Sequence, residues 1–206
     1  MDLNKTIAKV GSGIVIVTVF LFALFLIINY PMGYFFVCLI LPLGFIMMTA
    51  GLNNECESDR KVAANIGLIL AAVYGTIIML VYFTQLTTVK NEQLTEQAAN
   101  LLEFGRFGLI FNYDLLGYGI MALSTFFTGL SMKAKNKADK WLKALMIIHG
   151  VFYFSCTFMP MTGMFSKMSS GGDGLSGRLA LVAWCVYFLP VGILSFLHFR
   201  KEEINA

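Results

Sequence analysis

The chain has 206 residues, of which 58% are hydrophobic and only 13% are charged. A soluble domain carries about 45–50% apolar and about 25% charged residues, so this composition excludes a disordered chain, a disulfide scaffold and an ordinary water-soluble globule. We therefore predict an all-α polytopic integral membrane protein, with residues 1–206 forming a single transmembrane domain.

Six segments are long and apolar enough to cross a bilayer as helices, which takes about 20 residues each. In chain order they are Val10–Asn29, Gly33–Leu52, Val62–Leu86, Phe107–Ser131, Leu142–Phe165 and Leu179–Phe199. Their continuous apolar character excludes the alternating strands of a membrane barrel. No segment has the charged face that a helix of a soluble bundle turns towards water. We expect one bundle of six transmembrane helices.

Basic residues gather at one end of the expected bundle. Eleven of the fifteen lie in the N-terminus, the 53–61 loop, the 132–143 segment and the C-terminus. Cytoplasmic loops of membrane proteins carry an excess of Lys and Arg, so we predict that both termini are cytoplasmic. The lysines between 133 and 143 belong to a short loop between spans. They indicate contact with anionic lipid headgroups of the bilayer rather than with nucleic acid.

Small residues recur at every fourth position along the third span. They are Ala63, Gly67, Ala71 and Gly75. A ridge of this kind lets another helix approach closely. The pattern predicts a helix–helix partner, and it leaves open whether that helix belongs to the same chain or to another subunit.

Asp114 is the only acidic residue inside a predicted span, and it lies about two turns, or about 10 Å, below the outer surface. A carboxylate at that depth is protonated or paired. One interpretation is a proton or cation site, or an anchor for a cationic ligand. The alternative is a hydrogen-bonded carboxylate that fixes helix contacts. Arg106, at the start of the same span, is a candidate partner.

Polar and aromatic side chains on neighbouring spans follow three- and four-residue steps, which places each set on one helix face. We expect some of them to line an outward-facing cavity with Asp114. The predicted ligand-binding residues are Tyr82, Gln85, Asp114, Tyr118, Tyr153 and Thr157. The alternative is ordinary hydrogen bonding between helices of a filled bundle.

The remaining reactive side chains do not form a recognised catalytic or metal motif. His149 is expected to bond a neighbouring helix, and His198 is expected to extend to the membrane interface. The two histidines lack zinc-ligand spacing, so we predict no metal and no cofactor. The four cysteines form no C-x-x-C pair and are expected to act as small apolar fillers. Pro160, inside the fifth span, favours a kink.

Three functions remain open. The preferred hypothesis is small-ligand binding or transport through the cavity around Asp114. The alternatives are a non-catalytic sensor, assembly or immunity partner, and an intramembrane enzyme acting on an apolar or lipid substrate, which the lack of a catalytic constellation disfavours. In size and span count alone the chain resembles small six-span bacterial proteins and the substrate-binding membrane subunits of vitamin importers. The expected location is a bacterial plasma membrane, and no residue role follows from that likeness.

Overall fold

The computed structural model describes residues 3–164 and 175–204, and no strand occurs among them. Six helical segments are long and apolar enough to cross a membrane, which is compatible with a membrane protein. They are Leu3–Ile27, Pro31–Asn54, Ser58–Val89, Leu109–Ser131, Lys137–Met161 and Gly177–Arg200. The all-helical class and the six apolar segments predicted from the sequence are confirmed.

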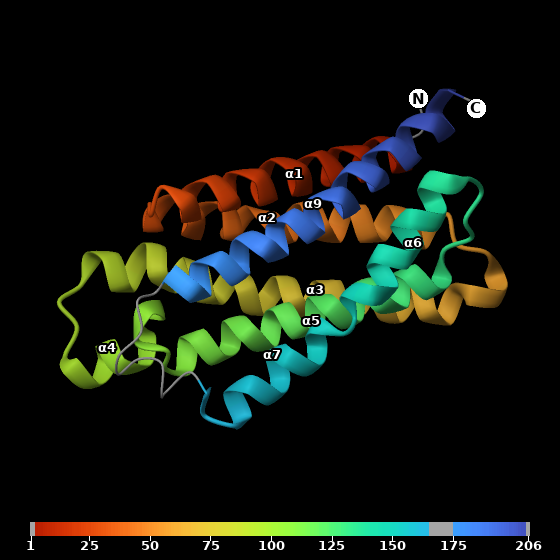
Figure 1. Cartoon of the computed structure of the whole chain (residues 1–206). Coiled ribbons are helices and arrows are strands. Elements are labelled where there is room, and N and C mark those ends of the chain that lie inside the picture. The colour runs from red at the N-terminus through yellow and green to blue at the C-terminus, as the bar shows by residue number, and fades with distance from the viewer. Residues whose placement is uncertain (1–2, 165–174, 205–206) are drawn as a thin grey trace.

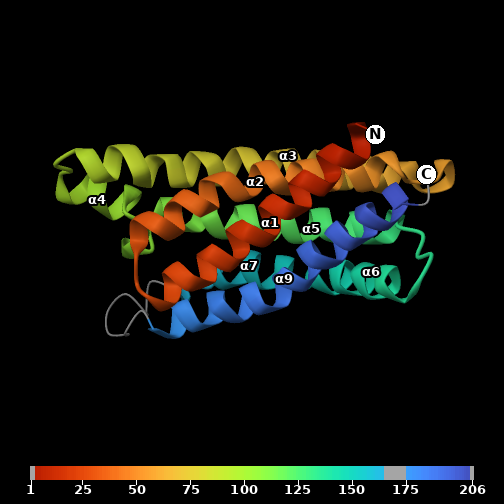
Figure 2. The same ribbon diagram turned by 90° about the horizontal axis from the view of Figure 1, so that it is seen from above.

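The helices run side by side along one direction, and α1 begins beside the end of α9 (Figure 1). The long helices are α1 (Leu3–Ile27), α2 (Pro31–Asn54), α3 (Lys61–Thr84), α5 (Leu109–Ser131) and α9 (Leu175–Ile204). The shorter elements are η1 (Ser58–Arg60), η2 (Gln85–Val89), α4 (Glu96–Leu102), η3 (Phe104–Arg106), α6 (Lys137–His149) and α7 (Phe152–Met161). Seen from above, α5 lies between α3 on one side and α6 with α7 on the other (Figure 2). We call the end that holds both termini the basic end, and the opposite end the α4 end.

Helices α1 and α2 form a tight antiparallel pair. Asn29 takes the left-handed backbone conformation with φ of 54°, and Pro31 begins α2. Pro suits the first helical position because its missing N–H would be unsatisfied there in any case. A Cβ at Gly11 would lie 2.8 Å from the carbonyl oxygen of Gly44. Glycine therefore sets the close approach of these two helices.

The small-residue ridge of α3 packs against helices of its own chain. A Cβ at Gly67 would meet Oγ1 of Thr128 and lie 3.1 Å from the carbonyl oxygen of Ser124. The Ser124 hydroxyl also donates to the carbonyl oxygen of Gly67 over 2.7 Å. Gly75 faces Ile46 of α2 in the same way. Helices α5 and α2 thus occupy this part of the ridge, and a partner from another subunit stays a prediction.

The fifth span is interrupted, whereas the sequence predicts one continuous helix over Leu142–Phe165. Helix α6 ends at His149 and α7 begins at Phe152. The N–H of Gly150 bonds the carbonyl of Ile147 three residues earlier, over 3.1 Å, instead of the usual residue four earlier. A Cβ at Gly150 would lie 2.8 Å from Cβ of Phe126 on α5. The interruption therefore falls where a glycine packs on α5, and Phe165 lies outside the described residues.

The segment after α3 folds back over the α4 end of the bundle, where α4 lies beside the start of α5 (Figure 1). The Gln85 side chain donates from Nε2 to the carbonyl oxygen of Leu102 over 2.7 Å. Its Oε1 accepts from the N–H of Phe104 over 3.0 Å. The Phe104 ring in turn stacks on Tyr82, with 6.1 Å between the ring centroids. We call residues 90–108 the cover segment.

Candidate functional site

Asp114 lies on α5 with only 5% of its surface exposed. The Tyr82 side chain on α3 lies beside its carboxyl group. One carboxyl oxygen, Oδ1, is buried and has no hydrogen-bond partner among the described residues. Buried polar atoms in native proteins are nearly always hydrogen-bonded, so this atom needs a proton, an ion or a ligand to complete it.

Two further tyrosines and a thiol lie in the neighbourhood of this carboxyl group. Tyr118 donates its hydroxyl hydrogen to Sγ of Cys38 over 3.6 Å. The Tyr74 ring lies 5.8 Å from the Tyr118 ring, and its hydroxyl is buried without a partner among the described residues. We call Cys38, Tyr74, Tyr82, Asp114 and Tyr118 the Asp114 cluster. It contains two buried polar atoms that the described chain leaves unpaired.

Arg106 does not serve as the counterion of Asp114. Its guanidinium group pairs with Glu103 at 3.2 Å and with Glu96 at 3.8 Å, both in the cover segment. The interaction between Arg106 and Asp114 considered from the sequence is therefore wrong. The guanidinium holds the cover segment together instead of compensating the buried carboxyl.

The six predicted ligand-binding residues occupy three places in the structure. Tyr82, Asp114 and Tyr118 belong to the Asp114 cluster. Tyr153 and Thr157 lie on α7 and face Gly119, where a Cβ would be 3.6 Å from the Tyr153 ring and 3.7 Å from Oγ1 of Thr157. The hydroxyl of Thr157 is a third buried oxygen without a described partner.

The sixth predicted residue, Gln85, is buried one turn beyond Tyr82 and bonds the backbone of the cover segment. It lies in the π-helical segment η2, and short π-helical turns are frequent at functional sites. The geometry makes Gln85 a link between the cover segment and the Asp114 cluster. A role of these six residues in ligand binding stays a prediction.

His149 is fully engaged at the point where the fifth span is interrupted. Its Nδ1 lies 2.8 Å from Oγ1 of Thr125 on α5, and its Nε2 accepts from the indole N–H of Trp184 on α9 over 3.1 Å. The expected bonding of His149 to a neighbouring helix is confirmed. Because both ring nitrogens are occupied, His149 is not available to activate a thiol such as Cys38 as a nucleophile.

The clearest polar constellation of the described chain is one that the sequence analysis missed. His198 is buried on α9, so its expected extension to the membrane interface is wrong. Its Nδ1 lies 2.9 Å from Oδ1 of Asp139, and its Nε2 lies 2.9 Å from Oε2 of Glu55. Asp139 is itself buried, so the bundle contains a second buried acidic residue in addition to Asp114. We call Glu55, Asp139 and His198 the His198 triad.

Local sequence signals for this triad exist. Asn136 caps α6 by accepting the N–H of Asp139 on its side-chain oxygen over 3.1 Å. Asn at such a position, followed three residues later by an acidic residue, is a helix-start pattern. Ser195 and His198 are three residues apart, which places both on one face of α9, and both are buried. The convergence of Asp139 with Glu55 at the end of α2 has no local signal.

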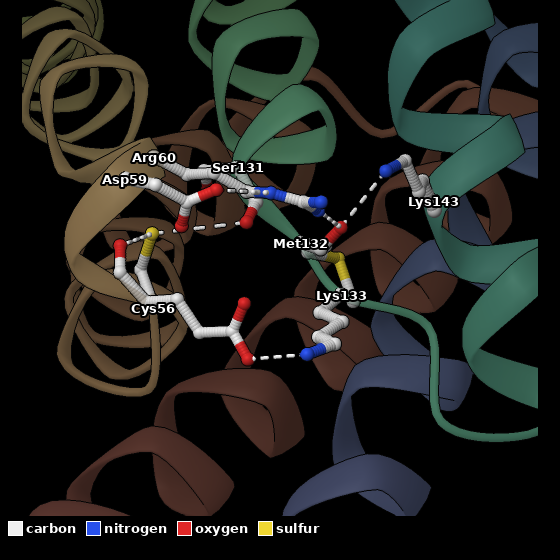
Figure 3. A network of polar contacts seen from close by, with 8 residues as sticks. Cys56, Asp59, Arg60, Ser131, Met132, Lys133 and Lys143 are labelled. Atoms are coloured by element: carbon white, nitrogen blue, oxygen red, sulfur yellow. Dashed lines mark hydrogen bonds and ion pairs between the residues drawn. The ribbon is translucent and has the colours of Figure 1, made fainter.

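The basic end is closed by side chains that bond the last carbonyls of α5 (Figure 3). Arg60 and Lys143 both donate to the carbonyl oxygen of Met132, over 3.1 Å and 2.8 Å. Lys133 pairs with Glu57 at 2.7 Å. Cations near a helix C-terminus bind its free carbonyls and the negative end of its dipole. This network joins the loop after α2, the start of α3, the end of α5 and α6.

Two cavities accompany these features, and Asp114 lines neither of them. One of about 50 Å³ adjoins the His198 triad and includes Glu55, Cys56, Lys133 and His198 in its lining. The other, of about 360 Å³, is an apolar hollow beside the interruption of the fifth span, lined by four residues. These are Val151, Phe152, Phe154 and Ser155.

The described part of the chain holds no group of three or more His, Cys, Asp or Glu side chains arranged to bind a metal ion. No family model, curated protein or solved structure matches this chain. Function is therefore argued from the geometry of the bundle.

Proposed function

We propose that this chain is a membrane protein that binds a small ligand within the half of the bundle nearest the α4 end, with Asp114 as the anchor. The observation that supports this is the buried Oδ1 of Asp114, which lacks a partner among the described residues. A buried carboxyl group is costly unless a cation or a hydrogen-bond donor satisfies it. A ligand with an ammonium group, or a small cation, supplies that missing interaction.

The surroundings of Asp114 support a ligand of this chemistry. The tyrosine hydroxyls of the Asp114 cluster act as both donors and acceptors, and their rings favour nearby positive charge. The hydroxyl of Tyr74 is unpaired among the described residues and offers a second polar contact. One carboxyl group and several tyrosines in an apolar bundle form a small, selective polar region of the kind that orients a ligand.

The cover segment is the proposed entrance. The side chain of Gln85 holds this segment on the bundle through hydrogen bonds to the backbone of Leu102 and Phe104. The Phe104 ring lies over Tyr82, which is a neighbour of Asp114. A ligand that approaches from the α4 end therefore displaces this segment, and closure of the segment afterwards shields the carboxyl from water. Transport is a further step beyond binding. It requires in addition a path by which the ligand passes His149 to reach the basic end.

Thermal unfolding of the purified full chain in detergent tests the proposal. The probes are sodium, potassium and a series of primary and quaternary alkylammonium chlorides, each at matched ionic strength. We expect at least one probe to raise the Tm of the parent, because a ligand that binds only the folded state stabilises it. Asp114→Asn should then need at least about tenfold more of that probe for the same rise, since it loses a charged contact.

The control for this experiment is Asp59→Asn, which removes an exposed carboxylate that pairs with Arg60. This variant should respond to each probe as the parent does. Equal stabilisation of the parent and of Asp114→Asn by every effective probe contradicts the anchor role of Asp114. A parent that responds to none of the probes contradicts a cationic ligand.

A non-catalytic membrane partner is the second candidate function. The interrupted fifth span carries large apolar side chains that the rest of the chain leaves exposed, among them Trp141, Val151, Phe154 and Met161. This side is available to lipid or to a helix of another protein. Cross-linking of a Val151→Cys variant in membranes tests it, with Val62→Cys on the exposed face of α3 as the control.

The proposed orientation places the basic end in the cytoplasm. Lys90 and Lys137 are exposed side chains at opposite ends of the bundle. In a Cys56→Ser background, an impermeant thiol reagent should label Lys90→Cys in intact cells and Lys137→Cys only after permeabilisation. The reverse pattern of labelling contradicts the orientation inferred from the basic residues.

A further inference from the structure

The His198 triad joins three separate parts of the bundle. Glu55 follows the end of α2, Asp139 lies in the first turn of α6, and His198 is near the end of α9. Both nitrogens of the imidazole lie 2.9 Å from a carboxylate oxygen. The side chains of Asp139 and His198 are 3% and 6% exposed, whereas that of Glu55 is 19% exposed. The contact to Glu55 is thus the outer one.

With both carboxyl groups ionised, both contacts exist together only when the imidazole carries two protons. A neutral histidine has one N–H donor, and its second nitrogen is an acceptor. That second nitrogen would face a carboxylate oxygen, which also only accepts. Loss of one proton therefore replaces an attractive contact with a repulsive one on one side of the ring.

The structure indicates which contact is lost. Asp139 is held by other groups, because its Oδ2 accepts from the N–H of Lys135 over 3.1 Å and from the side-chain amide of Asn136 over 3.0 Å. It is too buried to exchange its contacts for water. Glu55 has no such anchoring, since its Oε1 is buried without a partner among the described residues. The remaining proton of a neutral ring therefore stays on Nδ1, facing Asp139.

We propose that Glu55, Asp139 and His198 form a proton-operated latch at the basic end of the bundle. With the imidazole doubly protonated, Glu55 ties the end of α2 to α9. When Nε2 loses its proton to solvent, Glu55 is released towards the adjoining cavity of about 50 Å³. That volume is enough for water molecules to solvate the freed carboxylate. The end of α2 then separates from α9 while α6 and α9 stay joined.

Other titratable groups lie in the cavity beside the latch and on the elements around it. Cys56, Glu57, Lys133 and Lys135 line the cavity that adjoins His198. The neighbouring elements carry Arg60 on η1, Lys143 on α6, Lys5 and Lys9 on α1, and Arg200 on α9. The Glu57 carboxylate pairs with Lys133 at 2.7 Å, and the charged ends of Arg60 and Lys143 bind the carbonyl of Met132. Among the described residues, the two ring nitrogens of His198 face Asp139 and Glu55 alone.

Substitutions at Glu55 separate the locked and open states. The amide introduced by Glu55→Gln accepts from a protonated Nε2 through its oxygen and donates to an unprotonated Nε2 through its nitrogen. This variant therefore keeps the latch closed at every pH. Glu55→Ala removes the contact at every pH. Glu57→Gln removes an equivalent charge next to the same cavity without touching His198, and is the matched control.

Cys56, directly after Glu55 and in the lining of the cavity, reports the opening. Its rate of modification by a soluble thiol reagent is measured for the full chain in detergent between about pH 6 and about pH 9. Dividing the rate of the parent by that of Glu55→Gln removes the pH dependence that the two chains share, and the same ratio for Glu57→Gln accounts for the loss of one negative charge next to the thiol. We expect this ratio to rise about threefold or more with pH, because opening exposes the half-buried side chain of Cys56.

The modification rates of the other two variants test whether this rise comes from the latch. Glu55→Ala should be modified faster than Glu55→Gln throughout, and Glu57→Gln should show the same rise relative to Glu55→Gln as the parent. A ratio that stays constant across the pH range overturns the latch. A rise that Glu57→Gln abolishes also overturns it, because the pH response then belongs to the charge of Glu57.

A second measurement observes the imidazole rings of the parent chain directly. The chain has two histidines, so ¹⁵N-labelled imidazoles give two sets of signals, and a His149→Gln sample assigns them. His198 should carry protons on both nitrogens at the acidic end of the range and only on Nδ1 at the alkaline end. A ring that stays neutral throughout, or one that keeps its last proton on Nε2, overturns the proposal.

Discussion

Trp184 donates its indole N–H to Nε2 of His149 over 3.1 Å, and this contact fixes the state of the histidine. An indole N–H can only donate, so Nε2 must be the acceptor of a neutral ring and the proton must reside on Nδ1. Nδ1 then donates to Oγ1 of Thr125 over 2.8 Å, and the Thr125 hydroxyl donates to the carbonyl oxygen of Ala122 over 2.8 Å. A chain of three directed hydrogen bonds joins α9, α6 and α5 inside the bundle.

Trp184→Phe should lower the stability of the bundle by about 1–3 kcal/mol, because Nε2 of the buried His149 loses its donor. The measurement is the free energy of unfolding in mixed micelles, or the Tm of the purified chain. Trp141→Phe is the control, since Trp141 is 68% exposed on the outer side of α6. A Trp184→Phe variant as stable as Trp141→Phe would show that the bond to His149 contributes nothing.

Gly67→Ala should also destabilise the chain, by about 1–3 kcal/mol, through overpacking. The added Cβ would lie 3.1 Å from the backbone nitrogen of Thr128 and 3.1 Å from the carbonyl oxygen of Ser124, neither of which can rotate away. Gly13→Ala is the matched control within a helix, because its nearest neighbour would be a Phe196 ring atom at 3.9 Å. Equal Tm values for the two variants would contradict the close packing of α3 on α5.

Gln85→Leu should loosen the cover segment without unfolding the bundle. The substitution removes the partners of the Leu102 carbonyl and the Phe104 N–H, while the apolar core of the bundle is unchanged. Hydrogen exchange between residues 99 and 107 should become about tenfold faster or more, which corresponds to about 1.4 kcal/mol of local stability. Gln97→Leu, at an exposed position on α4, should leave these rates unchanged. Faster exchange throughout α3 and α5 would indicate global rather than local destabilisation.

Lys143→Met should weaken the closure of the basic end by about 1 kcal/mol, because Met132 loses a charged donor to its carbonyl oxygen. The effect is moderate since Arg60 still donates to the same oxygen. Lys140→Met removes an equal charge from an exposed position on α6 and controls for net charge. The comparison is made by Tm at low and high salt, and a Lys140→Met effect as large as that of Lys143→Met would contradict a specific contact.

The sequence predicts the six membrane-spanning segments of this protein, because each apolar run is a local property of the chain. Six runs of bilayer length require no knowledge of the rest of the chain. The burial of Asp114 is likewise expected from its position within such a run. The interruption at Gly150 is less evident, because an isolated glycine within a helical pattern is usually tolerated and its effect depends on the packing of Phe126.

What the sequence determined by itself is the helical class, the six apolar segments and the identity of Asp114 as a carboxyl group in an apolar span. Only the tertiary structure decided the partners of the polar groups. Glu55 and His198 are 143 residues apart along the chain and 2.9 Å apart in space. No local pattern encodes such a pair, because it depends on how the ends of α2, α6 and α9 meet. The same reason explains why Arg106 pairs with Glu103 and leaves Asp114 without a cation among the described residues.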